Sequence, residues 1–194
     1  MRFDRHELDA ATVIVRRHVP PTPQYSWPLL NELVGSRVIV KHENHTPVGM
    51  GSGINALIAV RDLLGLDTQI VGVVSEQAPS TLLSFERGEV VTTERAATFV
   101  DGVATRSPDP ESIAGIIAGA ARVIAVSDDA TADAMRIIYR TTHNVAESAG
   151  AIALAGLLSE PSDRRGERSA FVLCGGNVDT AQLHAVLGGA TPTA

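Results

Sequence analysis

Gln69-Ile70-Val71-Gly72-Val73-Val74-Ser75 is a β-branched run with the character of a buried strand. Working outward, Arg122 to Val126 and Ala170 to Cys174 read as further strands, and helical patterns alternate with them. This alternation predicts an α/β fold in which the three strands share one mainly parallel sheet with helices on both faces. The expected helices span residues 54–64, 79–87, 109–121, 127–139 and 145–158, with a last one starting at Asp179.

The N-terminal part is expected to contribute a short helix within residues 1–18 and a strand at Arg37 to Lys41. Between them, Ser26 is a plausible N-cap for a helix that Pro28 opens and Gly35 ends. Glu89-Val90-Val91 is predicted to be one more short strand.

The amino-acid composition excludes several classes of protein and of site. The 194 residues carry a formal charge of −6, which argues against nucleic-acid binding through phosphate contacts. One cysteine excludes an internal disulfide and a cysteine-rich metal site, so no metal is expected. The charged N-terminus and the lack of a long apolar run predict a soluble cytoplasmic protein without a membrane partner. Lys41 is the only lysine, so any lysine chemistry has one candidate.

A glycine-rich stretch, Val48-Gly49-Met50-Gly51-Ser52-Gly53, leads into the helix that begins at Ile54. Glycines at alternate positions let backbone N–H groups converge on a phosphate at the helix N-terminus. The stretch fits neither the Walker pattern nor the dinucleotide pattern, and a purely structural turn explains it equally well.

Two other segments could carry chemistry. Glu147 stands at the start of a small-residue helix, where an acidic side chain also simply suits the helix dipole. Cys174-Gly175-Gly176-Asn177 ends a strand, which is where open α/β sheets place ligands, although a lone cysteine is more often an apolar filler.

In this order, the three motifs resemble those of fold-type II pyridoxal-phosphate enzymes, and most closely the threonine/serine dehydratases (ammonia-lyases). Pro21-Thr22-Pro23, the segment from Val40 to Pro47 and Phe99 to Ala104 resemble further family segments. The resemblance implies the fold of that family's large domain, pyridoxal 5'-phosphate as cofactor, threonine or serine as substrate, and a homo-oligomer. It implies cofactor-binding roles for Gly49, Met50, Gly51, Ser52, Gly53, Glu147, Cys174 and Asn177.

By that resemblance, the backbone amides of residues 49–53 would hold the cofactor phosphate. Cys174 would face the pyridine nitrogen, Glu147 would line the pocket and Asn177 would shape the adjoining loop. A weak, neutral partner at the ring nitrogen moderates the electron sink and favours β-elimination over transamination.

The resemblance breaks after Pro47. The family continues into a motif whose lysine forms the Schiff base, then into a small domain, whereas here Thr46-Pro47 passes directly to Val48 and the glycine loop. Residues 1–47 are therefore interpreted as the N-terminal segment of the large domain and 48–194 as the phosphate loop with the remainder of that domain; the small domain is absent. Lys41 does not match the Schiff-base position, so no catalytic residue is assigned.

Three hypotheses follow: a dehydratase-family protein that is impaired or inactive, a non-catalytic module that binds pyridoxal phosphate or phosphate, and a subunit that pairs with a full-length relative. His42 and His45 are candidates for a substitute base, although two solvated surface histidines are the simpler interpretation. Surfaces left uncovered by the missing segment predict self-association.

Overall fold

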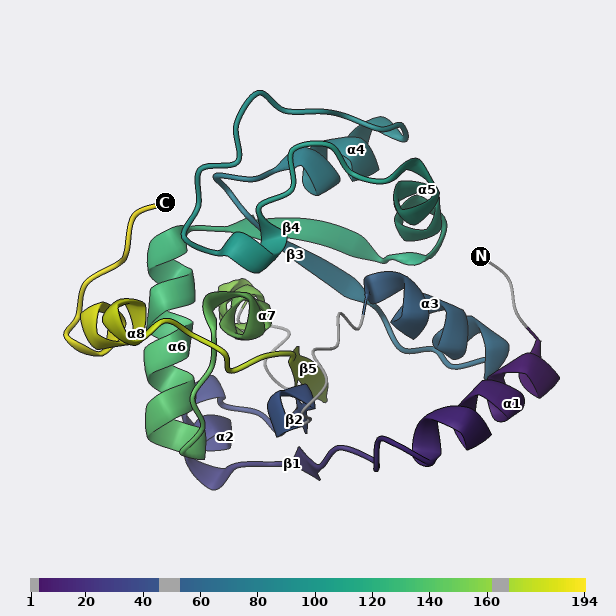
Figure 1. Ribbon diagram of the computed structural model, residues 1–194, viewed down its shortest axis with the longest axis horizontal. Helices are drawn as coiled ribbons and strands as arrows, with labels where there is room; N and C mark the ends of the chain where they lie inside the picture. The colour runs from purple at the N-terminus through teal and green to yellow at the C-terminus, as the bar shows by residue number, and fades with distance from the viewer. Residues whose placement is uncertain (1–3, 46–52, 162–167) are drawn as a thin grey trace.

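The protein is seen in a computed structural model that describes residues 4–45, 53–161 and 168–194 (Figure 1). The strands of these residues are β1 (Gln24–Tyr25), β2 (Val38–His42), β3 (Val71–Ser75), β4 (Arg122–Val126) and β5 (Ser169–Leu173). The helices are α1 (Arg5–Arg16), α2 (Pro28–Val34), α3 (Ile54–Leu63), α4 (Ser80–Arg87), α5 (Pro110–Gly119), α6 (Asp128–Thr142), α7 (Ser148–Ser159) and α8 (Thr180–Leu187). Two short 3₁₀ turns, η1 (Glu43–His45) and η2 (Asp101–Val103), lie in connections.

The predicted α/β class is confirmed, with parallel strand pairs flanked by helices. The prediction that the three strands share one sheet is wrong. Among the described residues, β3 pairs in parallel with β4, whereas β5 pairs in parallel with β2 in a second sheet. The second sheet is completed by β1, which runs antiparallel to β2 and had no strand signal in the sequence. β-Branched runs predict that strands are buried, but they carry no information about which strands pair.

Helix α7 lies between the two strand pairs in Figure 1 and packs on both. Its small residues make this possible. A Cβ on Gly156 would lie 2.5 Å from the Val73 side chain of β3. A Cβ on Gly150 would lie 2.5 Å from the carbonyl oxygen of Gly175, just beyond β5. One apolar helix therefore holds together two sheets that do not pair with each other among the described strands.

Two apolar clusters form the core. The larger one joins α2, β2, α6, α7 and β5, and its fully buried side chains include Leu30, Val40, Ile138, Leu154 and Leu173. The smaller one lies between the β3–β4 pair and α5, around Val74, Ile113, Ile116 and Val123. Among the described residues, no helix combines the length and the apolar character needed to span a bilayer.

Most local predictions are confirmed to within a few residues. Pro28 opens α2, Gly35 ends it with φ of 77°, and Ser127 and Asp179 cap α6 and α8 with their side chains. Two predictions are wrong. Trp27, not Ser26, is the N-cap of α2, because Ser26 Oγ instead accepts a hydrogen bond from the Asn31 side chain. Residues 89–91 form no strand, because the Val91 N–H is taken by Ser84 Oγ at 2.8 Å.

Candidate functional site

Glycine packing brings the end of β5 onto the start of α7. The Glu147 N–H donates to the carbonyl oxygen of Gly175 at 3.1 Å. A Cβ on Gly176 would lie 2.8 Å from the carbonyl oxygen of Val145. On the other side of α7, a Cβ on Gly102 of η2 would lie 2.6 Å from the Ala149 side chain. Three segments that are far apart in sequence therefore meet at the carboxyl end of β5, the location at which parallel sheets bind ligands.

The Glu147 carboxylate lies against the Cys174–Asn177 loop. A Cβ on Gly175 would lie 2.2 Å from Glu147 Oε1, so any side chain at position 175 would displace this carboxylate from its present position. Burial raises the pKa of Glu147, the nearby Asp101 charge raises it further, and the backbone N–H of Asn177 acts in the opposite direction. Glu147 is the N-cap residue of α7, but its side chain makes no capping hydrogen bond. The carboxylate is thus oriented toward the loop rather than toward its own helix.

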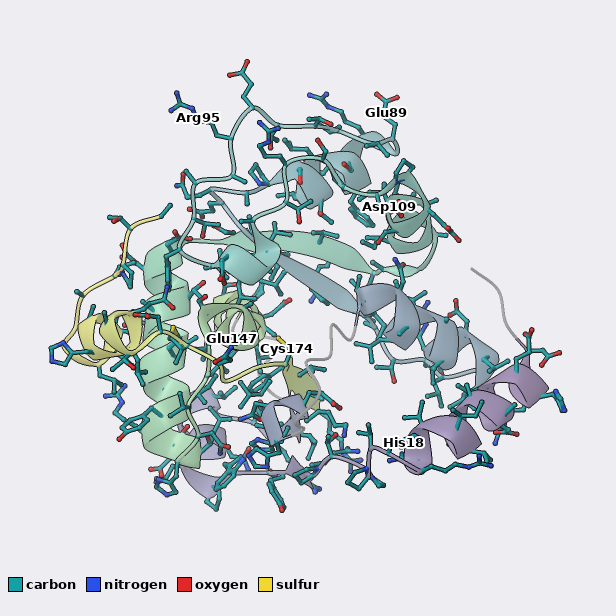
Figure 2. All side chains as sticks on the ribbon, in the orientation of Figure 1. His18, Glu89, Arg95, Asp109, Glu147 and Cys174 are labelled. Atoms are coloured by element: carbon teal, nitrogen blue, oxygen red, sulfur yellow. The ribbon has the colours of Figure 1, made fainter. Side chains whose placement is uncertain are left out.

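Cys174 lies beside Glu147 (Figure 2). Its thiol is half-buried and donates to the carbonyl oxygen of Ala149 at 3.4 Å. Burial, followed by the negative charge of Glu147, raises the pKa of the Cys174 thiol. The thiol is therefore a neutral, weak hydrogen-bond donor rather than a thiolate nucleophile.

The other predicted site residues are only partly described. Asn177 is exposed and contributes its backbone N–H to Glu147. Gly53 is the N-cap residue of α3, and a Cβ placed there would meet no atom within 4 Å. Gly49, Met50, Gly51 and Ser52 lie outside the described residues. The structure thus brings Glu147, Cys174 and Asn177 together and leaves the phosphate-loop prediction untested.

The interpretation of His42 as a solvated surface residue is wrong. The His42 side chain is fully buried, and its Nε2 accepts a hydrogen bond from the Trp27 indole N–H at 3.1 Å. Burial lowers the pKa of His42, His45 adds to the effect, and the Asn44 amide opposes it. Because an indole can only donate, the neutral ring carries its proton on Nδ1, and Nε2 is not available as a base.

Sequence reasoning missed a polar link beside the Cys174–Asn177 loop. His45 Nε2 lies 2.7 Å from Asn144 Oδ1, and the Asn44 side-chain amide donates to the same oxygen at 3.5 Å. Asn144 in turn donates to the carbonyl oxygen of Thr142 at 2.6 Å, which fixes its Oδ1 as the acceptor. This link ties the end of β2 to the α6–α7 connection. No spacing in the sequence connects Asn144 to Asn44, which lies 100 positions earlier.

Lys41 is engaged on the opposite face of β2 from His42. Residues alternate along the strand, so His42 points into the core with Val40, and Lys41 points away from it. Lys41 Nζ donates to both oxygens of Thr22, at 2.9 Å for the carbonyl oxygen, and lies 3.1 Å from Glu43 Oε1. This ammonium lines a groove of about 330 Å³ beside α1. Its hydrogen bonds hold the N-terminal connection against β2.

Residues 46–175 match the sequence profile described as "Pyridoxal-phosphate dependent enzyme". The match covers most of the chain and includes the glycine loop, Glu147 and Cys174. The chain belongs to this family. Its members use pyridoxal phosphate, and the fold-type II resemblance is thereby confirmed at the level of family and cofactor.

Proteins similar in sequence to this chain include dehydratases of hydroxy amino acids. The chain is 28% identical to an L-threonine ammonia-lyase of Thermotoga maritima over 141 residues, which is 73% of this chain and 35% of the relative. It is 30% identical to a chloroplastic biosynthetic threonine dehydratase of Solanum tuberosum over 147 residues, which is 75% of this chain and 41% of the relative. The chain therefore matches about two fifths of these relatives' length.

Solved structures share the fold. A T.th. threonine deaminase has a TM-score of 0.82 at 19% identity, covering 91% of this chain and 99% of that one. Maize serine racemase has a TM-score of 0.74 at 16% identity, covering 95% of this chain and 98% of that one. At these identities, the likeness establishes the fold of this pyridoxal-phosphate family protein and leaves its activity open.

Proposed function

We propose that this chain is a threonine/serine dehydratase-family protein that holds pyridoxal phosphate without a covalent link and, by itself, deaminates threonine or serine weakly or not at all. The observation that carries the proposal is the contrast between Cys174 and Lys41. A neutral thiol stands at the end of β5 with Glu147, while the only lysine is bonded to Thr22 and Glu43, on the face of β2 that is turned away from His42 and the core.

The polar side chains at the end of β5, Cys174 and Glu147, suit the pyridine ring of the cofactor. Burial and Glu147 raise the pKa of the thiol, so Cys174 stays protonated and, by turning its hydrogen from the Ala149 carbonyl oxygen, offers a neutral partner to the pyridine nitrogen. Glu147 and Asp101 place acidic groups at this end, which disfavours a phosphate here. This supports a binding orientation in which Cys174 and Glu147 contact the ring and the backbone of residues 49–53 takes the phosphate.

When bound, pyridoxal phosphate supplies an electron sink that assists loss of a proton and of a hydroxyl group from a hydroxy amino acid. That chemistry also requires a base at the substrate. The Lys41 ammonium donates to Thr22 and forms an ion pair with Glu43. His42 Nε2 already accepts a hydrogen bond from the Trp27 N–H. His45 is exposed, but its Nε2 is directed at Asn144. Slow deamination, or none, is the expected result.

Titration with pyridoxal phosphate followed by dialysis tests the proposal. We expect saturable binding that dialysis removes, binding about fivefold weaker in Cys174→Ala, and little loss in Cys174→Ser, since a hydroxyl replaces the thiol donor. Lys41→Gln, the matched control, should leave binding unchanged. Ammonia release from threonine and serine should stay near background.

Two results would overturn this. One is a cofactor absorbance band that survives dialysis and becomes fixed to Lys41 by borohydride. The other is binding that Cys174→Ala leaves unchanged. Absence of any binding would favour the remaining hypothesis, a subunit that pairs with a full-length relative.

A further inference from the structure

Helix α1 exposes apolar side chains on the face turned away from the groove that it lines. Leu8 and Val15 border that groove. Ala10, Val13, Ile14 and Arg17 follow the i, i+3, i+4, i+7 spacing of the opposite face. Val13 is 57% exposed and Ile14 is 60% exposed, and no residue of α1 is buried. An apolar stripe on this helix therefore faces solvent.

Helix α1 has little tertiary packing to stabilise it, although it is short. A 12-residue helix is marginal in water without tertiary packing. Here its N-terminus is held by a capping box between Asp4 and Glu7, and Figure 1 shows the helix at the edge of the molecule. The whole chain exposes 11123 Å², whereas a compact monomer of its mass exposes about 8,800 Å². That excess belongs to the whole surface, and α1 contributes to it as the one α-helix of the described residues in which no residue is buried.

The charges on α1 are divided along its axis. The first turns carry Asp4, Glu7 and Asp9 against a single Arg5, and the last turn carries Arg16 and Arg17. One end of the helix is thus net acidic and the other net basic. Such a helix complements a copy of itself that runs in the opposite direction.

We propose that α1 pairs antiparallel with α1 of a second copy of this chain, around a two-fold axis. A register that sets Ala10 against Ile14 of the second copy also sets Glu7 against Arg17, because both pairs are symmetric about the same point of the helix. The two-fold axis repeats each contact, so the apolar stripe is covered and an ion pair closes each end. The pairing stands whether or not the chain binds pyridoxal phosphate.

Sedimentation equilibrium of the full chain tests the pairing. We expect the wild type to dimerise and Ile14→Asp to weaken the dimer at least about tenfold, since a charge replaces the centre of the stripe. Leu29→Asp is the matched control. Leu29 is 53% exposed on α2, away from α1 in Figure 1, and its replacement should leave the dimer intact. Circular dichroism should show both variants folded.

The charges test the direction of the pair. Arg17→Gln and Glu7→Gln should each weaken the dimer, and the double variant E7Q/R17Q should weaken it no further than either, because both remove the same ion pair while glutamine at position 7 keeps the capping box with Asp4. A wild type that stays monomeric at about 100 µM, or a dimer that Ile14→Asp and Leu29→Asp affect alike, overturns the proposal. Losses that simply add in E7Q/R17Q overturn the antiparallel arrangement.

Discussion

The α7–β5 corner, where Glu147 to Gly150 meets Cys174 to Asn177, and the α1 flank differ in how tightly they are packed. In the corner, backbone meets backbone: a Cβ on Gly150 would come within 2.5 Å of the Gly175 carbonyl oxygen. In α1, no residue is buried. In the corner, backbone contacts leave no space for an added Cβ at Gly150 or Gly176. Helix α1 instead has a capping box and no buried residue. A substitution should therefore have a large effect on stability in the corner and a small one in α1.

The largest expected effect comes from Gly150→Ala. The added methyl would meet the backbone oxygen and nitrogen of Gly175, which cannot swing away as a side chain can. We expect a loss of about 2 kcal/mol in the free energy of unfolding, despite the better helix propensity of alanine. Urea unfolding followed by circular dichroism measures it.

Gly53→Ala serves as the control for this substitution, since a Cβ there meets no atom within 4 Å and the residue has a φ of −61°. Its free energy of unfolding should change by less than about 0.5 kcal/mol. Equal losses in both variants would show that the close approach of α7 to the loop is not what stabilises the corner.

A smaller effect is expected where the N-terminal region joins the core, at Trp27. Trp27→Phe removes the indole N–H that donates a hydrogen bond to His42 Nε2. The buried Nε2 is then left without a donor, which should lower the free energy of unfolding by about 1–2 kcal/mol. Because the pKa of His42 is lowered by burial, the folded ring resists a proton that the unfolded chain takes up. The wild type should thus lose stability as the pH falls below about 6.5.

Thermal unfolding followed by circular dichroism at about pH 7.5 and 5.5, on either side of the ordinary histidine pKa, checks both statements. Tyr25→Phe is the matched control, because Tyr25 is 49% exposed and stacks edge-on against Trp27 without entering the His42 bond. A Trp27→Phe variant as stable as Tyr25→Phe would contradict the role given to the indole N–H.

The sequence predicted local structure far better than long-range pairing. Pro28, Gly35, Ser127 and Asp179 marked helix ends because caps and left-handed turns are decided within a few residues. The separation of β5 from β3 depends on α7 lying between them, which no local pattern encodes. For the same reason, the burial of His42 under Trp27 was missed.

The candidate site was predictable where the motifs lie at the carboxyl end of one strand. Cys174, Gly175 and Asn177 follow β5 directly, and Glu147 reaches them through the start of α7. Asn144 and Asn44 could not be found, because amide side chains acquire a role only once folding places them opposite one another. Sequence motifs therefore locate the loop at the site, while its polar supports require the fold.

The smallest expected effect, and the most specific to the corner, is the pH dependence of Glu147→Gln. Burial, then the charge of Asp101, raises the pKa of Glu147 above its ordinary value of 4.5. A raised pKa means that the folded state holds the proton more tightly than the unfolded chain. The stability that this confers is complete below about pH 4.5 and is lost as the pH rises through the folded-state pKa. Glutamine carries no charge at either pH, so its stability does not follow that decline.

The free energy of unfolding of Glu147→Gln, relative to wild type, should therefore become more favourable between about pH 4.5 and pH 7. Urea unfolding of the variant and the wild type at the two pH values measures how their stability difference changes with pH, and this comparison cancels the titration of groups that do not interact with Glu147. Glu89→Gln is the control for replacing a carboxylate by an amide, since Glu89 is exposed and projects from the surface in Figure 2. If Glu147→Gln instead lost ground toward neutral pH, the ionised carboxylate would be stabilised by the Asn177 N–H more than burial opposes it. The corner would then favour an anion, contrary to the orientation proposed for the cofactor ring.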